Sequence, residues 1–201
     1  MGAREEILQA VRANRPKLER PAPVVPRFDS APPASLADLF VKNLLMMGGE
    51  FLPSTSSAEA LEAVRRRLEG ARTVCSVAPE ITGNRALSAA RGPADLADID
   101  AAVVRASFGV AETGSVLLTD QNLLVNAVAY LAQHLIVLLD PAEIVLNLHT
   151  AYARPEFRER RYACFHTGPS ATADIEGVLI HGAQGVRSLA LAFLPPATRP
   201  D

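Results

Sequence analysis

The segment HLIVLL, residues 134–139, decides the fold class of this chain. It is a continuous apolar run with β-branched members, which is typical of a strand that is covered on both faces. Comparable runs lie at residues 72–78, 101–106, 115–119 and 188–194. Strands of this kind occur in parallel sheets that have helices packed on both sides.

Helical patterns alternate with these runs. Ser35 is placed to cap a helix that ends at Gly48, and a second helix is predicted over residues 56–70. Further strands are predicted at residues 50–54 and 162–167, and further helices at residues 84–91, 125–131 and 141–152. This order of elements predicts an α/β fold with a mostly parallel sheet flanked by helices.

The N-terminal part of the chain has a different character. Residues 3–14 place Ile7, Leu8 and Val11 on one face of a short helix, which needs another surface to be stable. The prolines between residues 16 and 33 predict an extended linker, because proline fixes φ and lacks a backbone donor. We therefore divide the chain into an N-terminal helical arm with its linker, residues 1–34, and an α/β domain, residues 35–201.

Charge and hydropathy exclude several classes of protein. The formal net charge is −2 without any block of like charge, which argues against nucleic-acid binding and against a polybasic membrane segment. The longest apolar stretch, residues 123–139, contains Asn126, Gln133 and His134 and is predicted to be core, so no membrane span is expected. The charged N-terminus lacks the apolar segment of a signal peptide.

The cysteines and histidines do not form a metal-binding pattern. Cys75 and Cys164 lie in separate apolar strands, so a disulfide scaffold or a four-cysteine metal site is excluded and an iron–sulfur cluster held by this chain alone is not expected. The four histidines form no H-x-x-x-H pair, and no metal site is predicted. Two buried thiols are typical of a reducing compartment, and the predicted location is the cytoplasm.

A lone carboxylate, Glu112, stands at the mouth of a predicted strand in GVAETGSVLLTD, residues 109–120. Gly114 predicts a turn with a backbone conformation that other residues resist. Two interpretations are open. Glu112 is either a solvent-exposed residue of a tight turn, or a carboxylate held where burial raises its pKa or where it acts as a nucleophile.

A second turn is predicted in HTGPSATADIE, residues 166–176. Gly168 and Pro169 follow a strand, and Ser170 or Thr172 can cap the helix expected next. Such a turn presents free backbone N–H groups at the positive end of a helix, so it is either an anion site or a helix cap without a ligand.

The placement of the loops suggests a common ligand site. Ligands of open α/β sheets bind at the carboxyl ends of the strands, where the strand order reverses. We therefore expect the loops at residues 107–114, 119–126 and 166–174 to converge there. His166 and His181 flank the second turn, and each is either a ligand contact or a structural hydrogen-bonding residue.

The order of GVAETGSVLL, QHLIVLL and TGPSATADIEGVLIHGAQG resembles the LUD-domain family, in its lactate-utilisation protein C branch. In that family an A-E-[ST]-G-[ST] turn leads a strand, a strand begun by histidine follows, and G-P-S-x-[TS]-A-D-I-E and H-G-P motifs come last. The resemblance covers about residues 72–194. This chain departs from the family in having Ala183 in place of the proline, and a short loop DQNLLVN where relatives often have a longer basic one.

The resemblance implies a fold similar to the superfamily of ribose-5-phosphate isomerase, glucosamine-phosphate deaminase and CoA transferases. It implies a role in oxidising L-lactate to pyruvate, with the iron–sulfur clusters in partner proteins and no cofactor in this chain. CoA transferases use a glutamate in an E-x-G turn as nucleophile, and Glu112 is similar, which makes it the candidate catalytic residue.

The candidate ligand-binding residues belong to the two turns and to the H-G motif: Thr113, Gly114, Thr167, Gly168, Pro169, Ser170, Ala171, Thr172 and His181. The expected ligand is a small carboxylate, or a phosphorylated or CoA-linked compound. Two hypotheses remain open. The chain is either an enzyme subunit, or a non-catalytic assembly subunit that uses its N-terminal arm and sheet edges; a homo-oligomer is compatible with both.

Overall fold

A five-stranded parallel sheet forms the centre of the computed structural model, which describes residues 2–16, 23–24, 33–173, 179–182 and 184–196. Its strand order is β1-β11-β6-β3-β2, and every neighbouring pair is parallel. The strands are β1 (Glu50–Leu52), β2 (Val74–Ser76), β3 (Ala101–Arg105), β6 (His134–Leu139) and β11 (Ser188–Phe193). The predicted α/β fold with a mostly parallel sheet is confirmed, and HLIVLL is the middle strand.

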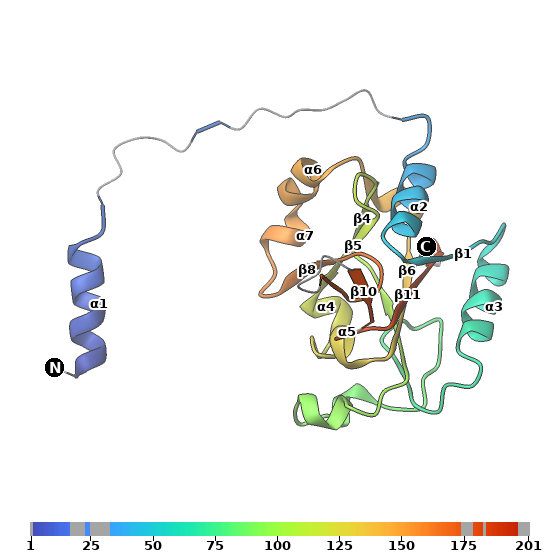
Figure 1. Cartoon of the computed structure of the whole chain (residues 1–201), viewed down its shortest axis with the longest axis horizontal. Helices are drawn as coiled ribbons and strands as arrows, with labels where there is room; N and C mark the ends of the chain where they lie inside the picture. Colours follow the sequence, from blue (N-terminus) through green and yellow to red (C-terminus); the bar gives the residue numbers. More distant parts are fainter. Residues whose placement is uncertain (1, 17–22, 25–32, 174–178, 183, 197–201) are drawn as a thin grey trace, which may run out of the picture.

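Helices and a second sheet cover the two faces of the parallel sheet (Figure 1). On one face, Ala60 and Val64 of α3 (Ser57–Arg67) pack against Ile136 and the neighbouring side chains of the sheet. On the other face lie α2 (Leu36–Met46) and the second sheet. Both helices begin where the sequence predicts, because Ser35 and Ser56 accept the N–H groups of the third residue on.

The second sheet has four strands in the order β7-β4-β5-β8. Its strands are β4 (Phe108–Val110), β5 (Ser115–Thr119), β7 (Ile144–Val145) and β8 (Ala163–His166). The β4–β5 and β5–β8 pairs are antiparallel, and only β4–β7 is parallel. Val116 and Leu118 face the central core, while Leu117 faces a separate cluster beneath α6 (Leu148–Ala153) and α7 (Pro155–Arg158). Strand β5 is buried on both faces, so its sequence is a continuous apolar run like that of a strand in a parallel sheet.

Three predicted helices differ in the structure. Residues 84–91 contain only the 3-10 turn η1 (Leu87–Ala89), and the 3-10 turn η2 (Pro93–Leu96) follows it after Gly92. Residues 141–152 form the 3-10 turn η3 (Pro141–Glu143), β7 and the start of α6, because Ile144 and Val145 pair with β4. The helix predicted over 125–131 is α5 (Val128–Leu131), and α4 (Asp120–Leu123) precedes it.

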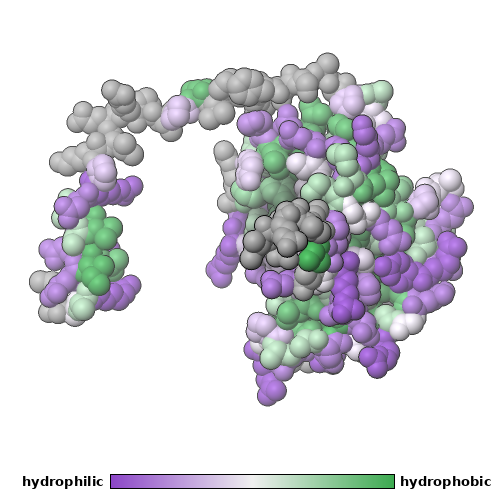
Figure 2. Space-filling view, in the orientation of Figure 1, coloured by the Kyte–Doolittle hydropathy of each residue, from purple (hydrophilic) through white to green (hydrophobic). Residues whose placement is uncertain are grey.

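The N-terminal helix, α1 (Ala3–Ala13), stands apart from the domain (Figure 1). No residue of α1 is buried, and Ile7 and Val11 are 64% and 63% exposed. Figure 2 shows green, hydrophobic atoms on the surface of this helix. The described part of the chain therefore offers no cover for the apolar face of this helix.

Within the described ranges, no helix combines the length and apolar character needed to cross a bilayer.

Candidate functional site

The end of α2 is wedged against both glycine turns. Gly114 has φ +66°, and a Cβ on it would lie 2.2 Å from the Leu44 nitrogen. Gly168 has φ +61°, and a Cβ there would lie 2.3 Å from the Met47 carbonyl oxygen. Real Cβ atoms do not approach backbone this closely, so each position requires glycine for its φ and for the space it leaves.

A chain of hydroxyl groups joins the two turns. Strands β5 and β8 are antiparallel, with Val116 opposite His166, and this register brings Ser115 next to Thr167. The Ser115 Oγ is hydrogen-bonded to Thr167 Oγ1, and it lies 2.7 Å from the hydroxyl oxygen of Thr113. Two motifs that are about fifty residues apart in the sequence are therefore direct neighbours.

A pocket of about 220 Å³ lies beside the second turn, between β8, α5 and the segment before β11. We call it the β8 pocket. Its walls consist of Ala129, Tyr130, Cys164, Phe165, His166, Thr167, Gly168, Pro169, Ser170, Gln184, Gly185 and Val186. Four of the predicted ligand-binding residues, Thr167 to Ser170, line it.

His166 is the most unusual side chain of this pocket. Its Nε2 atom is buried, and within the described part of the chain it has no hydrogen-bond partner. Burial lowers the pKa of His166 to about 4, so the ring is neutral at pH 7. A buried polar atom without a partner costs about 1–3 kcal/mol, which a bound group that pairs with Nε2 would recover.

Tyr130 provides a second polar group at the pocket. Its ring centroid lies 5.2 Å from that of His166, and its hydroxyl is hydrogen-bonded to the hydroxyl of Tyr162. Burial raises the pKa of Tyr130, so the phenol keeps its proton. The sequence analysis missed Tyr130 and Cys164 as pocket residues, because no motif links α5 to β8. The one available signal was strand alternation, which puts Cys164 on the same face of β8 as His166.

The turn itself differs from the prediction. Strand β8 is antiparallel to β5, and the chain continues as β9 (Ala171–Ala173), which forms an antiparallel pair with β10 (Leu179–His181). The expected helix does not follow Ser170, because its N–H donates to Val186 O at 2.9 Å and the next residues pair with β10. Ser170 and Thr172 are therefore not helix caps. The prediction of an anion site at the N-terminus of a following helix is wrong. Asp174 and Glu176 lie outside the described residues.

Five of the candidate ligand-binding residues lie away from the walls of the β8 pocket. Ala171 and Thr172 are exposed residues of the β9–β10 pair. The His181 ring packs at the end of α2, where its Cε1 atom lies 3.3 Å from the position of a Cβ on Gly48. Neither Thr113 nor Gly114 lines the pocket; Thr113 reaches it only through the hydroxyl chain.

Glu112 has a partner of its own. Its side chain is exposed, and Oε2 accepts the N–H of Leu148, the first residue of α6, at 3.0 Å. A carboxylate at a helix N-terminus is favourable, because the free N–H groups there carry partial positive charge. Asn43 of α2 holds the same turn by donating to the main-chain oxygens of Ala111 and Glu112. Glu112 is not among the residues that line the β8 pocket, so the structure does not bring it there with the Gly168 turn.

The position of the pocket also corrects the expectation about the strand ends. Helix α5 and residues 184–186 lead into β6 and β11, so the β8 pocket adjoins the amino ends of these parallel strands. The second turn lies at the same ends: a Cβ on Gly168 would lie 3.2 Å from the Gly49 nitrogen, just before β1, and the Ser170 N–H donates to Val186 O, just before β11. Among the described residues, no group of three or more His, Cys, Asp or Glu side chains could hold a metal ion.

Comparisons with known proteins place the chain in a family. The model of the LUD domain matches residues 37–191. A solved structure of a DUF162 family protein from Deinococcus radiodurans is similar in fold, with a TM-score of 0.62 and 21% sequence identity, over 81% of this chain and 100% of that one. No curated protein matches the sequence. Because the LUD model spans most of the chain, including both turns and the β8 pocket, the protein belongs to the LUD-domain family.

Proposed function

We propose that this protein is a component of an L-lactate utilisation system and that it binds a small carboxylate in the β8 pocket. Membership of the LUD-domain family supports the pathway. The observation that carries the ligand site is the buried Nε2 atom of His166, which lacks a partner among the described residues at the wall of a small pocket. The proposal keeps the cytoplasmic location expected from two cysteines that are both free thiols.

The chemistry of the pocket suits a small hydroxy or keto acid. A neutral imidazole donates or accepts at Nε2 according to its tautomer, so it can pair with a carboxylate or with the hydroxyl of lactate. The hydroxyl of Ser170 adds a donor on the same walls, and the phenol of Tyr130 adds another when Tyr162 donates the hydrogen bond between the two tyrosines. A volume of about 220 Å³ favours a small acid over a CoA compound.

Oxidation of lactate to pyruvate removes two electrons and two protons. We assign the electrons to iron–sulfur clusters in partner proteins, which is what the resemblance to the lactate-utilisation branch implies. No redox step is assigned to this chain. The catalytic role predicted for Glu112 stays a prediction, and its hydrogen bond to Leu148 supports a structural role as well.

The ligand proposal is tested by titrating the purified chain with lactate and with pyruvate while its thermal unfolding is followed. A ligand at about 100 times its Kd should stabilise the fold by about 2.7 kcal/mol. His166→Gln and Ser170→Ala should weaken binding, and His149→Gln, at an exposed histidine of α6, is the matched control. Absence of stabilisation by either acid, or equal weakening by the control, would contradict the proposal.

The assembly hypothesis has its own supporting observation, the exposed apolar face of α1. Ile7 and Val11 are more than half exposed, which is unusual for an amphipathic helix joined to a folded domain. If α1 docks on an iron–sulfur partner protein, removal of residues 1–34 should abolish association with that protein and leave ligand binding unchanged. Retained association after the deletion would rule this use of the arm out.

A further inference from the structure

A second pocket, of about 350 Å³, lies at the amino ends of β3 and β6 and shares no wall residue with the β8 pocket. We call it the arginine pocket. Its polar walls come from the end of α3 and the turn that follows it, from the residues that begin β3 and β6, and from the segment before β11: Arg67, Glu69, Asp100, Gln133, His134 and Arg187.

A hydrogen-bond network fixes two of these side chains. Arg67 donates from Nη2 to Ser188 Oγ at 2.8 Å, and the same oxygen lies 2.8 Å from His134 Nδ1. Because Arg67 can only donate, the Ser188 hydroxyl proton is free for Nδ1 of a neutral His134. We assign the ring proton of His134 to Nε2 on this pattern, which makes that atom a donor.

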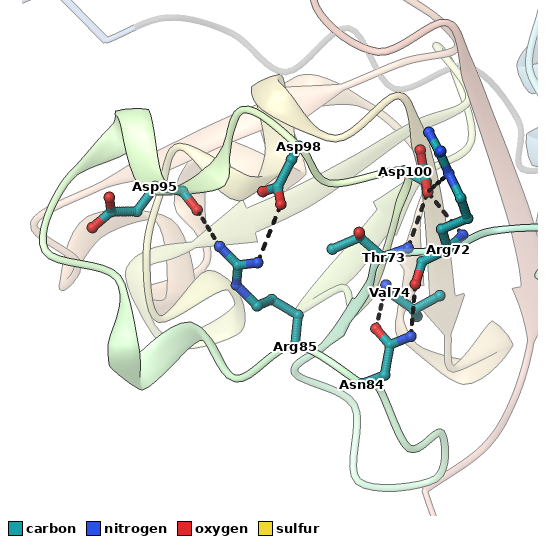
Figure 3. Close-up of polar contacts among 8 residues, drawn as sticks. All are labelled: Arg72, Thr73, Val74, Asn84, Arg85, Asp95, Asp98 and Asp100. Atoms are coloured by element: carbon teal, nitrogen blue, oxygen red, sulfur yellow. Dashed lines mark hydrogen bonds and ion pairs between the residues drawn. The ribbon is translucent and has the colours of Figure 1, made fainter.

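Two of the three acidic groups at the pocket already have partners; the third, Glu69 of the wall, is exposed and forms no ion pair or side-chain hydrogen bond within the described part of the chain. Glu50 accepts from Arg67 Nε at 2.9 Å. Asp100 accepts the N–H groups of Arg72 and Thr73 at 2.8 and 3.0 Å, and Figure 3 shows its carboxylate turned toward them. The positively polarised donors of these bonds offset part of the negative charge that Glu50 and Asp100 would otherwise present to an anion.

Arg187 is a solvent-exposed cation on the pocket wall. Within the part of the chain that the structure describes, the guanidinium of Arg187 forms no ion pair and no hydrogen bond. Burial, Arg67 and Arg187 lower the pKa of His134, and the negative charges of Asp100 and Glu50 oppose this effect. Burial is the largest of these effects.

We propose that the arginine pocket binds the phosphoryl group of a small ligand, through Arg187, the unused donors of Arg67 and Nε2–H of His134. Guanidinium groups and an imidazole N–H are all donors, and they suit an oxyanion with several acceptor oxygens. The phosphoryl group supplies a negative counter-ion for the guanidinium of Arg187. Asp100 and Glu50 keep their present hydrogen bonds when the ligand binds. This site is independent of the carboxylate proposed for the β8 pocket.

The test is a titration of the full chain with inorganic phosphate and with glycerol 3-phosphate by calorimetry. Arg187→Gln should weaken binding of both by about tenfold or more, because it removes a charge-assisted contact. Arg72→Gln is the matched control: it removes the same charge nearby from a residue outside the pocket walls, and should change Kd less than about twofold. A tighter Kd for the ester assigns a phosphorylated ligand, and a tighter Kd for phosphate assigns the free ion.

The His134 ring supplies a second readout by NMR. Sulfate, which stays a dianion between about pH 5 and 8, should raise the pKa of His134 in the original protein, since a bound anion favours the imidazolium. In Arg187→Gln the pKa of His134 should be higher before any addition and should respond less to sulfate. Equal losses of phosphate affinity in the two arginine variants, or a His134 pKa that sulfate does not move, would overturn the proposal.

Discussion

Lowering the pH from 7.5 to 5.0 should destabilise the folded protein through His166. The pKa of this residue is about 4 in the folded chain and about 6.5 in an unfolded one, because its ring is desolvated and Nε2 has no partner among the described residues. The folded pKa is depressed, so the unfolded chain takes up the proton first as the pH falls. Stability is therefore lost from about pH 6.5 down to about pH 4.

The size of the effect follows from these two values. Protonation linked to His166 alone lowers the free energy of unfolding by about 2 kcal/mol at pH 5.0, and by about 3 kcal/mol below pH 4, relative to neutral pH. For a protein whose total stability is of the order of 5–15 kcal/mol, this is a substantial share.

The assay is urea unfolding followed by circular dichroism at both pH values, since the chain has no tryptophan. The drop in unfolding free energy between the two pH values should be about 2 kcal/mol smaller in His166→Gln than in the original chain, because the other histidines are common to both proteins. The exposed His149→Gln should retain the full drop. If the original protein and His166→Gln lose the same amount, the buried, neutral state assigned to His166 is wrong.

Three other predictions concern the turns and the arm. Glu112→Ala should lower stability by about 1 kcal/mol in thermal unfolding by removing the acceptor for Leu148 N–H, whereas Glu112→Gln keeps an acceptor and should stay close to the original; activity retained in Glu112→Gln would remove the carboxylate from any mechanism. Gly168→Val should cost about 3 kcal/mol or more, because its Cβ would meet the Met47 carbonyl at positive φ, and an unchanged melting temperature would contradict the geometry. Ile7→Asp should leave the stability of the domain unchanged in urea unfolding, since α1 is exposed; a loss of more than about 1 kcal/mol would show that the arm packs on the domain.

The sequence by itself determined the elements that depend on local pattern. Apolar runs such as residues 134–139 and 188–194 marked the strands of the parallel sheet, since only a strand covered on both faces carries such a run. Ser35 marked the start of α2, because a side-chain cap is a contact between near neighbours, and the helical pattern from residue 56 marked α3. The family likewise followed from the spacing of short motifs along the chain.

Only the tertiary structure decided how the two glycine turns are used. Residues 115–119 are as apolar as a parallel strand, and their antiparallel pairing depends on which strands lie beside them, which no local pattern encodes. The partner of Glu112 is a helix that begins 36 residues later, and the walls of the β8 pocket come from α5, β8 and the segment before β11. Burial of His166 is likewise a property of the packed chain, because the desolvation that lowers its pKa comes from residues distant in sequence.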